Sequence, residues 1–320
     1  MIDTNVATDS ARIVVESLTK DFGKKIRAVD QLSFTVEPGS VTGFLGPNGA
    51  GKTTTLRMLL GLVRPTAGRA TIGGVQYSSL PHPLSRVGAS LESSSFHPAR
   101  SGRNHLRVLC AAAGLPDNRA DAVLAQVGLA DAANRKVRGY SLGMRQRLGL
   151  AAALIGDPRV LILDEPANGL DPDGIRWLRG FFRHLANEGR SVLVSSHQLT
   201  EIQEVADRVV ILDRGRLIRS GSIEELTAGT DTVRVRTPNP QPLVAALQAA
   251  GMHVQPDPTG AIAVRGAPVA HVGHIAFVNQ IELHELTGTR ATLEDLFFSL
   301  TQAAHQGAYP QTMPTVGERR

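Results

Sequence analysis

Cysteine is almost missing from this sequence, since Cys110 is the only one among 320 residues. A lone cysteine excludes an intrachain disulfide and a zinc site built from several cysteines. Long apolar runs are missing too: no window holds the roughly 18 uncharged apolar residues that a membrane span needs. Residues 148–155 are apolar but short, as in a buried helix, and residues 1–12 lack the apolar run of a secretory signal. We therefore expect a cytosolic chain that can still dock on a membrane protein.

The composition is that of a globular protein, with 42% hydrophobic and 20% charged residues. A length of 320 residues suits about two domains. The net charge of +5 is small for this length. It suits a phosphate ligand, a nucleic acid or an anionic membrane surface without choosing among them.

The strongest motif is a glycine-rich stretch of the form G-x-x-x-x-G-K-[ST]. With the threonine that follows, it consists of Gly46, Pro47, Asn48, Gly49, Ala50, Gly51, Lys52, Thr53 and Thr54. Apolar residues 41–45 predict a strand before it, and residues 54–60 predict a helix after it. Glycines let the backbone wrap around a polyphosphate, and the N-terminus of the helix attracts the same anion. Lys52 would reach the β- and γ-phosphates, and the Thr53 hydroxyl would bind Mg²⁺. The alternative, a glycine-rich turn with an accidental lysine, is disfavoured by the flanking strand and helix.

Two carboxylates, Asp164 and Glu165, follow the apolar run 160–163, which is typical of a strand buried on both faces. The carboxyl end of such a strand faces the ligand in α/β sheets. We expect Asp164 to hold Mg²⁺ through its water shell and Glu165 to act as general base on the attacking water. The alternative is a solvated pair of carboxylates at a strand end.

Three other positions are ambiguous when each is taken alone. Ser141 precedes a helix rich in Leu and Ala and can cap it, which leaves N–H groups free to bind an anion. A lone histidine is usually structural, although His197 follows the strand-like residues 191–195. Residues 168–172, which include Asp171, form by themselves only a turn.

Strand-like segments alternate with helical ones between residues 13 and 212, which favours a largely parallel α/β sheet. Near the start, residues 13–15 and 32–36 predict a pair of strands. The Ser-, Pro-, Gly- and His-rich residues 78–103 indicate an exposed, adaptable connection. Past residue 226 the patterns predict a βαββαβ order and a final helix. The segments in that order are 233–236, 242–250, 252–255, 261–265, 269–279, 281–286 and 292–301.

Together, these motifs resemble the nucleotide-binding subunit of ATP-binding cassette (ABC) transporters, whose motif order residues 13–226 follow. The resemblance implies that ATP and Mg²⁺ are the cofactors, that His197 is the switch histidine and that Phe22 stacks on adenine. It also implies that two copies of the chain pair head to tail. Ser141 and Gly143 of the signature segment and Asp171 of the D-loop would then complete the ATP site of the other copy.

Two details are similar to the bacitracin-type drug and antibiotic exporters of this family. The signature segment, residues 141–144, reads Ser-Leu-Gly-Met, and Glu92 stands where the family usually has its Q-loop glutamine. Residues 293–297 resemble the closing motif of the C-terminal extension in that group. For this extension, a packing and dimer-stabilising role and a regulatory role both stay open.

The resemblance implies an α/β fold in which a P-loop NTPase cassette spans residues 12–226. That cassette would contain an antiparallel β subdomain and a helical subdomain near residues 93–155. A small α+β domain would follow at 227–302, with a loose tail at 303–320.

The leading hypothesis is an ATPase that powers a separate permease at the inner face of the cell membrane, exporting a drug, antibiotic, peptide or lipid. Residues 78–103 would be the docking surface, and selectivity would lie in the permease. One alternative is a soluble cassette ATPase acting on nucleic acid or ribosomes, but the chain has one phosphate loop and no sustained heptad pattern. A second alternative, a binding module without hydrolysis, is disfavoured by the intact Lys52, Asp164, Glu165 and His197.

Overall fold

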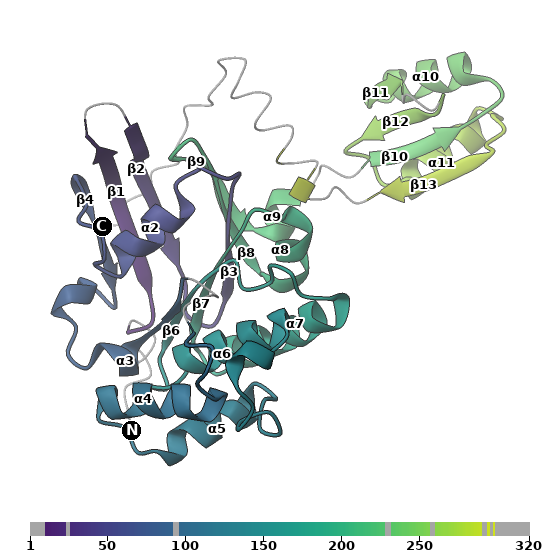
Figure 1. Ribbon diagram of the computed structural model, residues 1–320. Coiled ribbons are helices and arrows are strands. Elements are labelled where there is room, and N and C mark those ends of the chain that lie inside the picture. Colours follow the sequence, from purple (N-terminus) through teal and green to yellow (C-terminus); the bar gives the residue numbers. More distant parts are fainter. Residues whose placement is uncertain are drawn as a thin grey trace, which may run out of the picture. The chain divides into compact units, whose positions relative to one another are not determined.

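The computed structural model describes residues 10–23, 26–91, 96–227, 232–256 and 260–289, together with Leu293, Glu294 and Phe297. The chain divides into two compact units, residues 1–223 and 224–320 (Figure 1). Glu92, most of the helix expected at 292–301 and the tail at 303–320 lie outside the described residues.

A three-stranded antiparallel sheet opens the first unit, in the order β2-β1-β4. Its strands are β1 (Ile13–Phe22), β2 (Ile26–Val36) and β4 (Ala67–Ile72). Ile13 lies opposite Val36, so the strand pair expected from the sequence is confirmed. The apolar face of this sheet packs on α2 (Lys52–Leu59), which buries Leu56 and Leu59 against it.

A six-stranded sheet forms the centre of the unit, in the order β5-β6-β7-β3-β8-β9. Its strands are β3 (Val41–Leu45), β5 (Val87–Ser90), β6 (Val160–Asp164), β7 (Ser191–Ser196), β8 (Arg208–Asp213) and β9 (Arg216–Ser222). All neighbours are parallel except β8 and β9. The largely parallel α/β sheet is therefore confirmed, and its central strands carry continuous apolar runs because both faces are covered.

One expectation about this sheet is wrong. Residues 78–103 are not simply an exposed connection, because β5 within them forms an edge strand beside β6. Val87 and Gly88 are buried there, and a Cβ on Gly88 would lie 2.0 Å from the Ala153 carbonyl oxygen. A strand of four residues with one β-branched side chain carries too little periodicity to stand out in the sequence.

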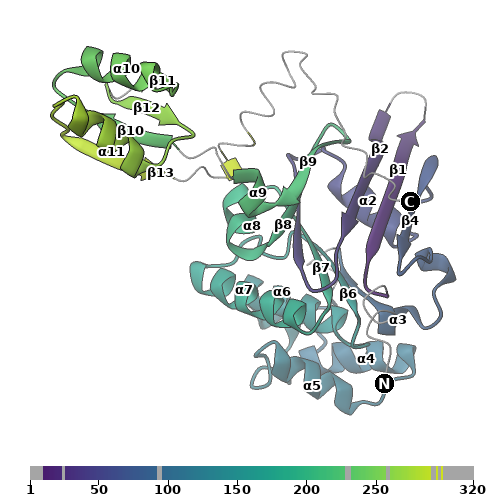
Figure 2. The same cartoon turned by 180° about the vertical axis from the view of Figure 1, so that it is seen from behind.

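Helices surround the central sheet, and α4, α5 and α6 pack against one another as a group (Figures 1 and 2). The helices of this unit are α3 (Pro83–Arg86), α4 (Gly102–Ala113), α5 (Asn118–Gln126), α6 (Leu142–Ala153), α7 (Pro172–Asn187) and α8 (Leu199–Val205), with short 3-10 helices at Tyr77–Ser79 and Val137–Gly139. A further helix, α9 (Ile223–Thr227), begins at the last residue of this unit and belongs mostly to the second. In α7, Leu178, Phe182 and Leu185 repeat at helical spacing and are buried. Burial of such side chains stabilises the fold by about 1.5–3 kcal/mol each.

The second unit contains a four-stranded antiparallel sheet in the order β11-β12-β10-β13, and α10 and α11 lie between its strands in the sequence. Its elements are β10 (Thr232–Arg236), α10 (Pro240–Ala249), β11 (His253–Pro256), β12 (Ile262–Arg265), α11 (Val269–Val278) and β13 (Glu285–Thr289). The expected βαββαβ order is confirmed. The last strand begins at Glu285 rather than at Ile281, since its register follows pairing with β10.

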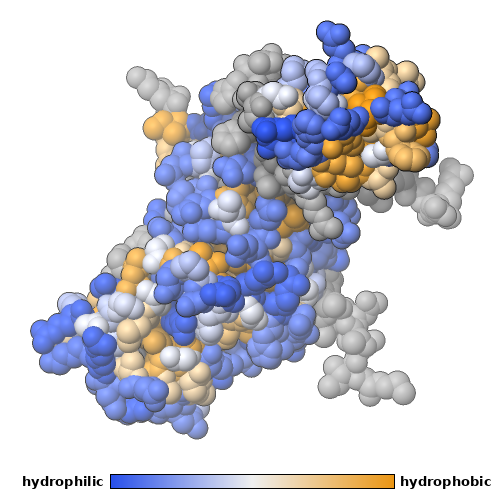
Figure 3. All heavy atoms as spheres, turned by 90° about the vertical axis from the view of Figure 1, so that its right-hand side faces the viewer, coloured by the Kyte–Doolittle hydropathy of each residue, from blue (hydrophilic) through white to orange (hydrophobic). Residues whose placement is uncertain are grey.

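Among the described residues, no helix combines the length and the apolar character that crossing a bilayer requires. Hydrophilic residues cover most of the face seen in Figure 3, and the apolar residues lie there in separate groups.

Candidate active site

The phosphate loop runs from the end of β3 to the start of α2, with Gly51 as the N-cap at φ = 98°. Two of its glycines are packed against backbone. A Cβ on Gly46 would lie 2.6 Å from the Leu212 carbonyl oxygen, and one on Gly51 would lie 2.4 Å from the Ala28 carbonyl oxygen. The loop therefore has a fixed path that only glycine allows at these positions.

Lys52 is buried beneath this loop, with 6% of its surface exposed. Its Nζ donates to the carbonyl oxygens of Gly46 at 2.6 Å and Pro47 at 3.3 Å, and lies 3.7 Å from Glu165 Oε1. Burial lowers the pKa of Lys52, and the charges of Glu165 and Asp164 oppose that shift. The ammonium group is thus held at the site by loop carbonyls and a carboxylate, ready to meet an anion.

Asp164, the last residue of β6, joins this strand to the loop. Thr53 Oγ1 donates to Asp164 Oδ2 at 2.8 Å, and the Ser195 hydroxyl donates to Asp164 Oδ1. A hydroxyl and a carboxylate placed side by side next to a phosphate loop are oxygen donors of the kind that Mg²⁺ prefers. The residues present therefore fit this ion.

Glu165 follows with a left-handed backbone, at φ = 51°. This conformation costs a residue other than glycine about 1–3 kcal/mol, and such residues gather at functional sites. The Glu165 amide donates to Ser195 Oγ at 3.0 Å and to the Ser195 carbonyl at 3.2 Å. Its side chain meets His197, whose Nδ1 lies 2.8 Å from Glu165 Oε2. The structure thus pairs a carboxylate and an imidazole next to Lys52. In this arrangement the carboxylate can accept a proton from a bound water.

Ser196 and Glu201, which are not among the expected site residues, lie next to the pair of Glu165 and His197. Ser196 Oγ donates to Glu201 Oε2 at 3.1 Å, from β7 to α8. Burial raises the pKa of Glu201, as does the charge of Glu165, while the Ser196 hydrogen bond opposes the shift. The only feature of the sequence that points to this contact is the pair of adjacent serines, Ser195 and Ser196, which follows apolar residues and precedes His197.

The signature segment and the D-loop cap two helices. Ser141 caps α6, accepting from the Met144 amide at 3.2 Å, and Asp171 caps α7, accepting from the Gly174 amide at 2.8 Å. Gln146 Nε2 on α6 donates to the Asn168 carbonyl at 3.3 Å, which ties the two segments together. In the part of the chain that the structure describes, no hydrogen bond or ion pair joins them to the phosphate loop.

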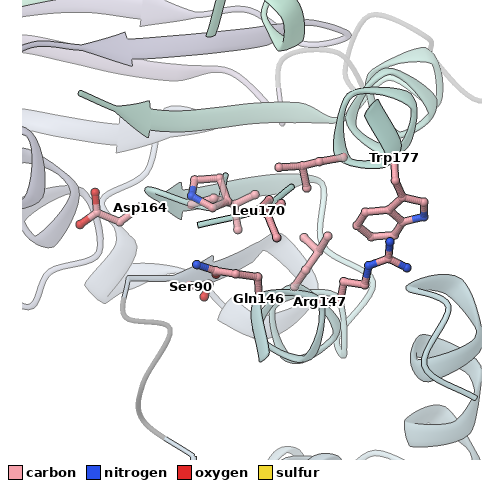
Figure 4. A pocket seen from close by; sticks show the side chains of 10 residues that line it. Ser90, Gln146, Arg147, Asp164, Leu170 and Trp177 are labelled. Atoms are coloured by element: carbon pink, nitrogen blue, oxygen red, sulfur yellow. The ribbon is translucent and has the colours of Figure 1, made fainter. Parts of the chain in front are cut away.

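A Cβ on Gly143 would lie 3.3 Å from Leu170 Cδ2, so the backbone of the signature segment approaches the D-loop closely. Beside Asp164, a small hollow that is partly open to solvent is lined by residues of α6 and α7 (Figure 4). Arg147 of α6 stacks on the Trp177 ring of α7 there, at 4.0 Å from the ring centroid. Signature segment and D-loop are therefore linked in one chain by packing as well as by hydrogen bonds.

Phe22 lies apart from these residues, at the end of β1, and 45% of its surface is exposed. Lys20 Nζ lies 5.1 Å from the centroid of its ring. Lys20 thus lies over the ring, and nearly half of the residue is accessible to a partner.

Comparisons with known proteins agree with this geometry. Residues 29–168 match a family model described as ABC transporter, and residues 231–294 match a model described only as a domain of unknown function. The chain is 36% identical over 318 residues to a daunorubicin resistance ATP-binding protein of Streptomyces coeruleorubidus, covering 94% of this chain and 97% of the relative. It is 41% identical over 220 residues to a bacitracin transport ATP-binding protein of Bacillus licheniformis, covering 68% and 72%.

Among solved structures, the fold is similar to that of an ATP-binding subunit of an ABC transporter. The TM-score is 0.60 at 26% identity, over 67% of this chain and 91% of the other.

Proposed function

The chain belongs to the ATP-binding proteins of ABC transporters, and we propose that its ATPase cycle drives export through a separate membrane permease. The chain is an ATPase of this family. The observation that carries the hydrolytic part of the proposal is the meeting of Lys52, Glu165 and His197 next to the phosphate loop. The export part rests on the relatives described above.

At this site, backbone N–H groups between residues 46 and 54, which Pro47 lacks, and the Lys52 ammonium bind the β- and γ-phosphates. Thr53 would hold Mg²⁺ through its hydroxyl and Asp164 through the water shell of the ion; their mutual hydrogen bond of 2.8 Å places the two groups side by side for this role. When bound, this ion neutralises phosphate charge and orients the phosphate oxygens. Glu165 takes a proton from the attacking water as general base, and His197 fixes the direction of that carboxylate.

Two copies of the chain form the working unit. Ser141, Gly143 and Asp171 of one copy face the phosphate loop of the other. The exposure of Ser141 and the absence of hydrogen bonds from these described residues to their own loop support this arrangement. The first turn of α6 would then present its free N–H groups to the γ-phosphate across the interface. Phe22 stacks on the adenine.

The transported compound is a drug, an antibiotic, a peptide or a lipid. This proposal rests on the relatives, whose names state bacitracin transport and daunorubicin resistance. The permease binds that compound and holds the ATPase at the inner face of the cell membrane. Neither relative is named for work on nucleic acid or ribosomes, so that alternative has no support of its own.

The test uses a tagged Glu165→Gln chain, recovered with ATP and Mg²⁺ from gently solubilised cells. We expect a polypeptide with several membrane spans to co-purify in amounts comparable to the bait. The same variant with Lys52→Ala added is the matched control, because it should no longer bind nucleotide. Recovery of ribosomes or nucleic acid without such a membrane polypeptide would overturn the export proposal and leave the ATP site in place.

A further inference from the structure

Ser195 is a buried hydroxyl between the two strands that carry the active site. It lies on β7, between β6 and β3, and none of its surface is exposed. In the parallel register, Ser195 is the partner of Asp164 on β6 and of Phe44 on β3. The sheet itself therefore fixes this side chain next to the Asp164 carboxylate.

This one hydroxyl is bonded to both neighbouring acidic residues. It donates its hydrogen to Asp164 Oδ1 and accepts the amide hydrogen of Glu165 at 3.0 Å. The Ser195 carbonyl lies 3.2 Å from the same amide. Ser195 thereby orients the carboxylate of one residue and the strained, left-handed backbone of the next.

The second oxygen of Asp164 is bonded differently. It accepts from Thr53 Oγ1 at 2.8 Å, and Thr53 is itself assigned to the ion in the proposed function. Thr53 can offer a lone pair of its oxygen to an ion while its hydrogen still donates to Asp164, so this bond lies at the ligand side of the carboxylate. The Ser195 hydroxyl is buried away from any ligand, so its bond to Asp164 can persist through the cycle.

We propose that Ser195 is a positioning residue of this ATPase, which aims Asp164 at Mg²⁺ and fixes the backbone from which Glu165 reaches the attacking water. It touches neither ion nor nucleotide and acts through the two carboxylates. The inference rests on the proposed function of the site. Groups that orient metal ligands in this way typically change metal affinity or activity by about 10–100-fold when removed.

Ser191 offers a matched control on the same strand. It is also fully buried, lies on the same side of the pleat, and donates one hydrogen bond, to the Ala11 carbonyl at 2.6 Å. Ser191→Ala and Ser195→Ala each delete one buried hydroxyl and leave an acceptor unpaired. The two variants should lose similar stability in urea, while only Ser195→Ala disturbs the carboxylates.

The measurement is equilibrium binding of trinitrophenyl-ATP with Mg²⁺ and with EDTA, followed by ATP hydrolysis against Mg²⁺ concentration. For Ser195→Ala we expect trinitrophenyl-ATP to bind in EDTA as it does to the unmodified chain, and Mg²⁺ no longer to change the affinity for this nucleotide. The Mg²⁺ concentration needed for half-maximal ATP hydrolysis should rise by about 10–100-fold. Ser191→Ala should behave as the unmodified chain does. If Ser195→Ala does not fold, Ser195→Cys fills the site with a slightly larger side chain that is a weaker donor, and it should show a smaller shift in the same direction.

Equal Mg²⁺ dependence in the Ser195 and Ser191 variants would overturn the positioning role and leave the ATPase intact. An unmodified chain that neither binds nor hydrolyses ATP would overturn the proposed site and this inference together.

Discussion

The Nδ1 atom of His197 lies 2.8 Å from Glu165 Oε2, while Nζ of the buried Lys52 lies 3.7 Å from Glu165 Oε1. The carboxylate of Glu165 is thus held between the imidazole of the residue that follows β7 and a cation from α2. Lys52 is more than a hundred residues away from the other two in the sequence, and the central sheet brings all three side chains together. The two contacts set the direction of the carboxylate before any substrate arrives.

Glu165 and His197 should therefore act as one unit. We expect Glu165→Gln to slow hydrolysis by about 10²–10⁴-fold and His197→Ala by an amount within the same range. The double variant should be about as slow as the slower single variant, since each change already breaks the pair. The measurement is the steady-state rate of ATP hydrolysis by the unmodified chain, the two single variants and the double variant, with ATP affinity measured in parallel.

Glu204→Gln on α8 is the matched control for the carboxylate change, because Glu204 is exposed. It should hydrolyse ATP at the normal rate. Multiplicative losses in the double variant would show that the two residues act independently.

The trans role of Ser141 can be separated from its capping role. Ser101 caps α4 as Ser141 caps α6, each accepting an amide hydrogen at 3.2 Å. Replacing either serine with alanine should cost about 0.5–2 kcal/mol of stability. Only Ser141→Ala should also weaken ATP-dependent pairing of two Glu165→Gln chains, measured by analytical ultracentrifugation. If both alanine variants paired equally well, Ser141 would be a cap and nothing more.

The phosphate loop offers a test of its fixed path. Gly49 and Gly51 both have positive φ, but a Cβ on Gly49 meets open space whereas one on Gly51 meets the Ala28 carbonyl oxygen at 2.4 Å. Gly49→Ala should cost about 1–2 kcal/mol from the left-handed backbone alone. Gly51→Ala should cost more and abolish ATP binding, because the loop must shift. Urea unfolding and nucleotide binding measure the two effects, and equal losses at both positions would contradict the packing argument.

Stability should depend on pH through Glu201. Its pKa is raised above the ordinary value of 4.5, chiefly by burial. From pH 4.5 up to the raised pKa, the folded chain keeps a proton that the unfolded chain loses, so this residue's contribution to stability falls as pH rises. Glu201→Gln removes that titration and can keep the bond to Ser196. The free energy of unfolding is measured by urea titration for both chains at each pH. The value for the unmodified chain minus the value for Glu201→Gln should decrease from pH 4.5 up to the raised pKa. A difference that stays constant with pH would refute the effect.

Two central strands were predictable, because the apolar residues 160–163 and 192–194 are typical of strands that are covered on both faces. The four-residue β5 was not, since its place beside β6 comes from pairing rather than from its own pattern. In the second unit the order of elements was predictable from alternating patterns. The start of β13 at Glu285 depended on register with β10.

The sequence by itself determined the phosphate loop, the carboxylate pair after an apolar strand and the family to which they point, because these features are local and have fixed spacing. Only the tertiary structure decided that Ser195 bridges Asp164 and Glu165, and that Ser196 meets Glu201. Such contacts depend on which strands lie side by side and on a register of single residues. A serine at the end of a strand is chemically the same in sequence whether it faces solvent or a catalytic carboxylate, and the sheet makes that choice.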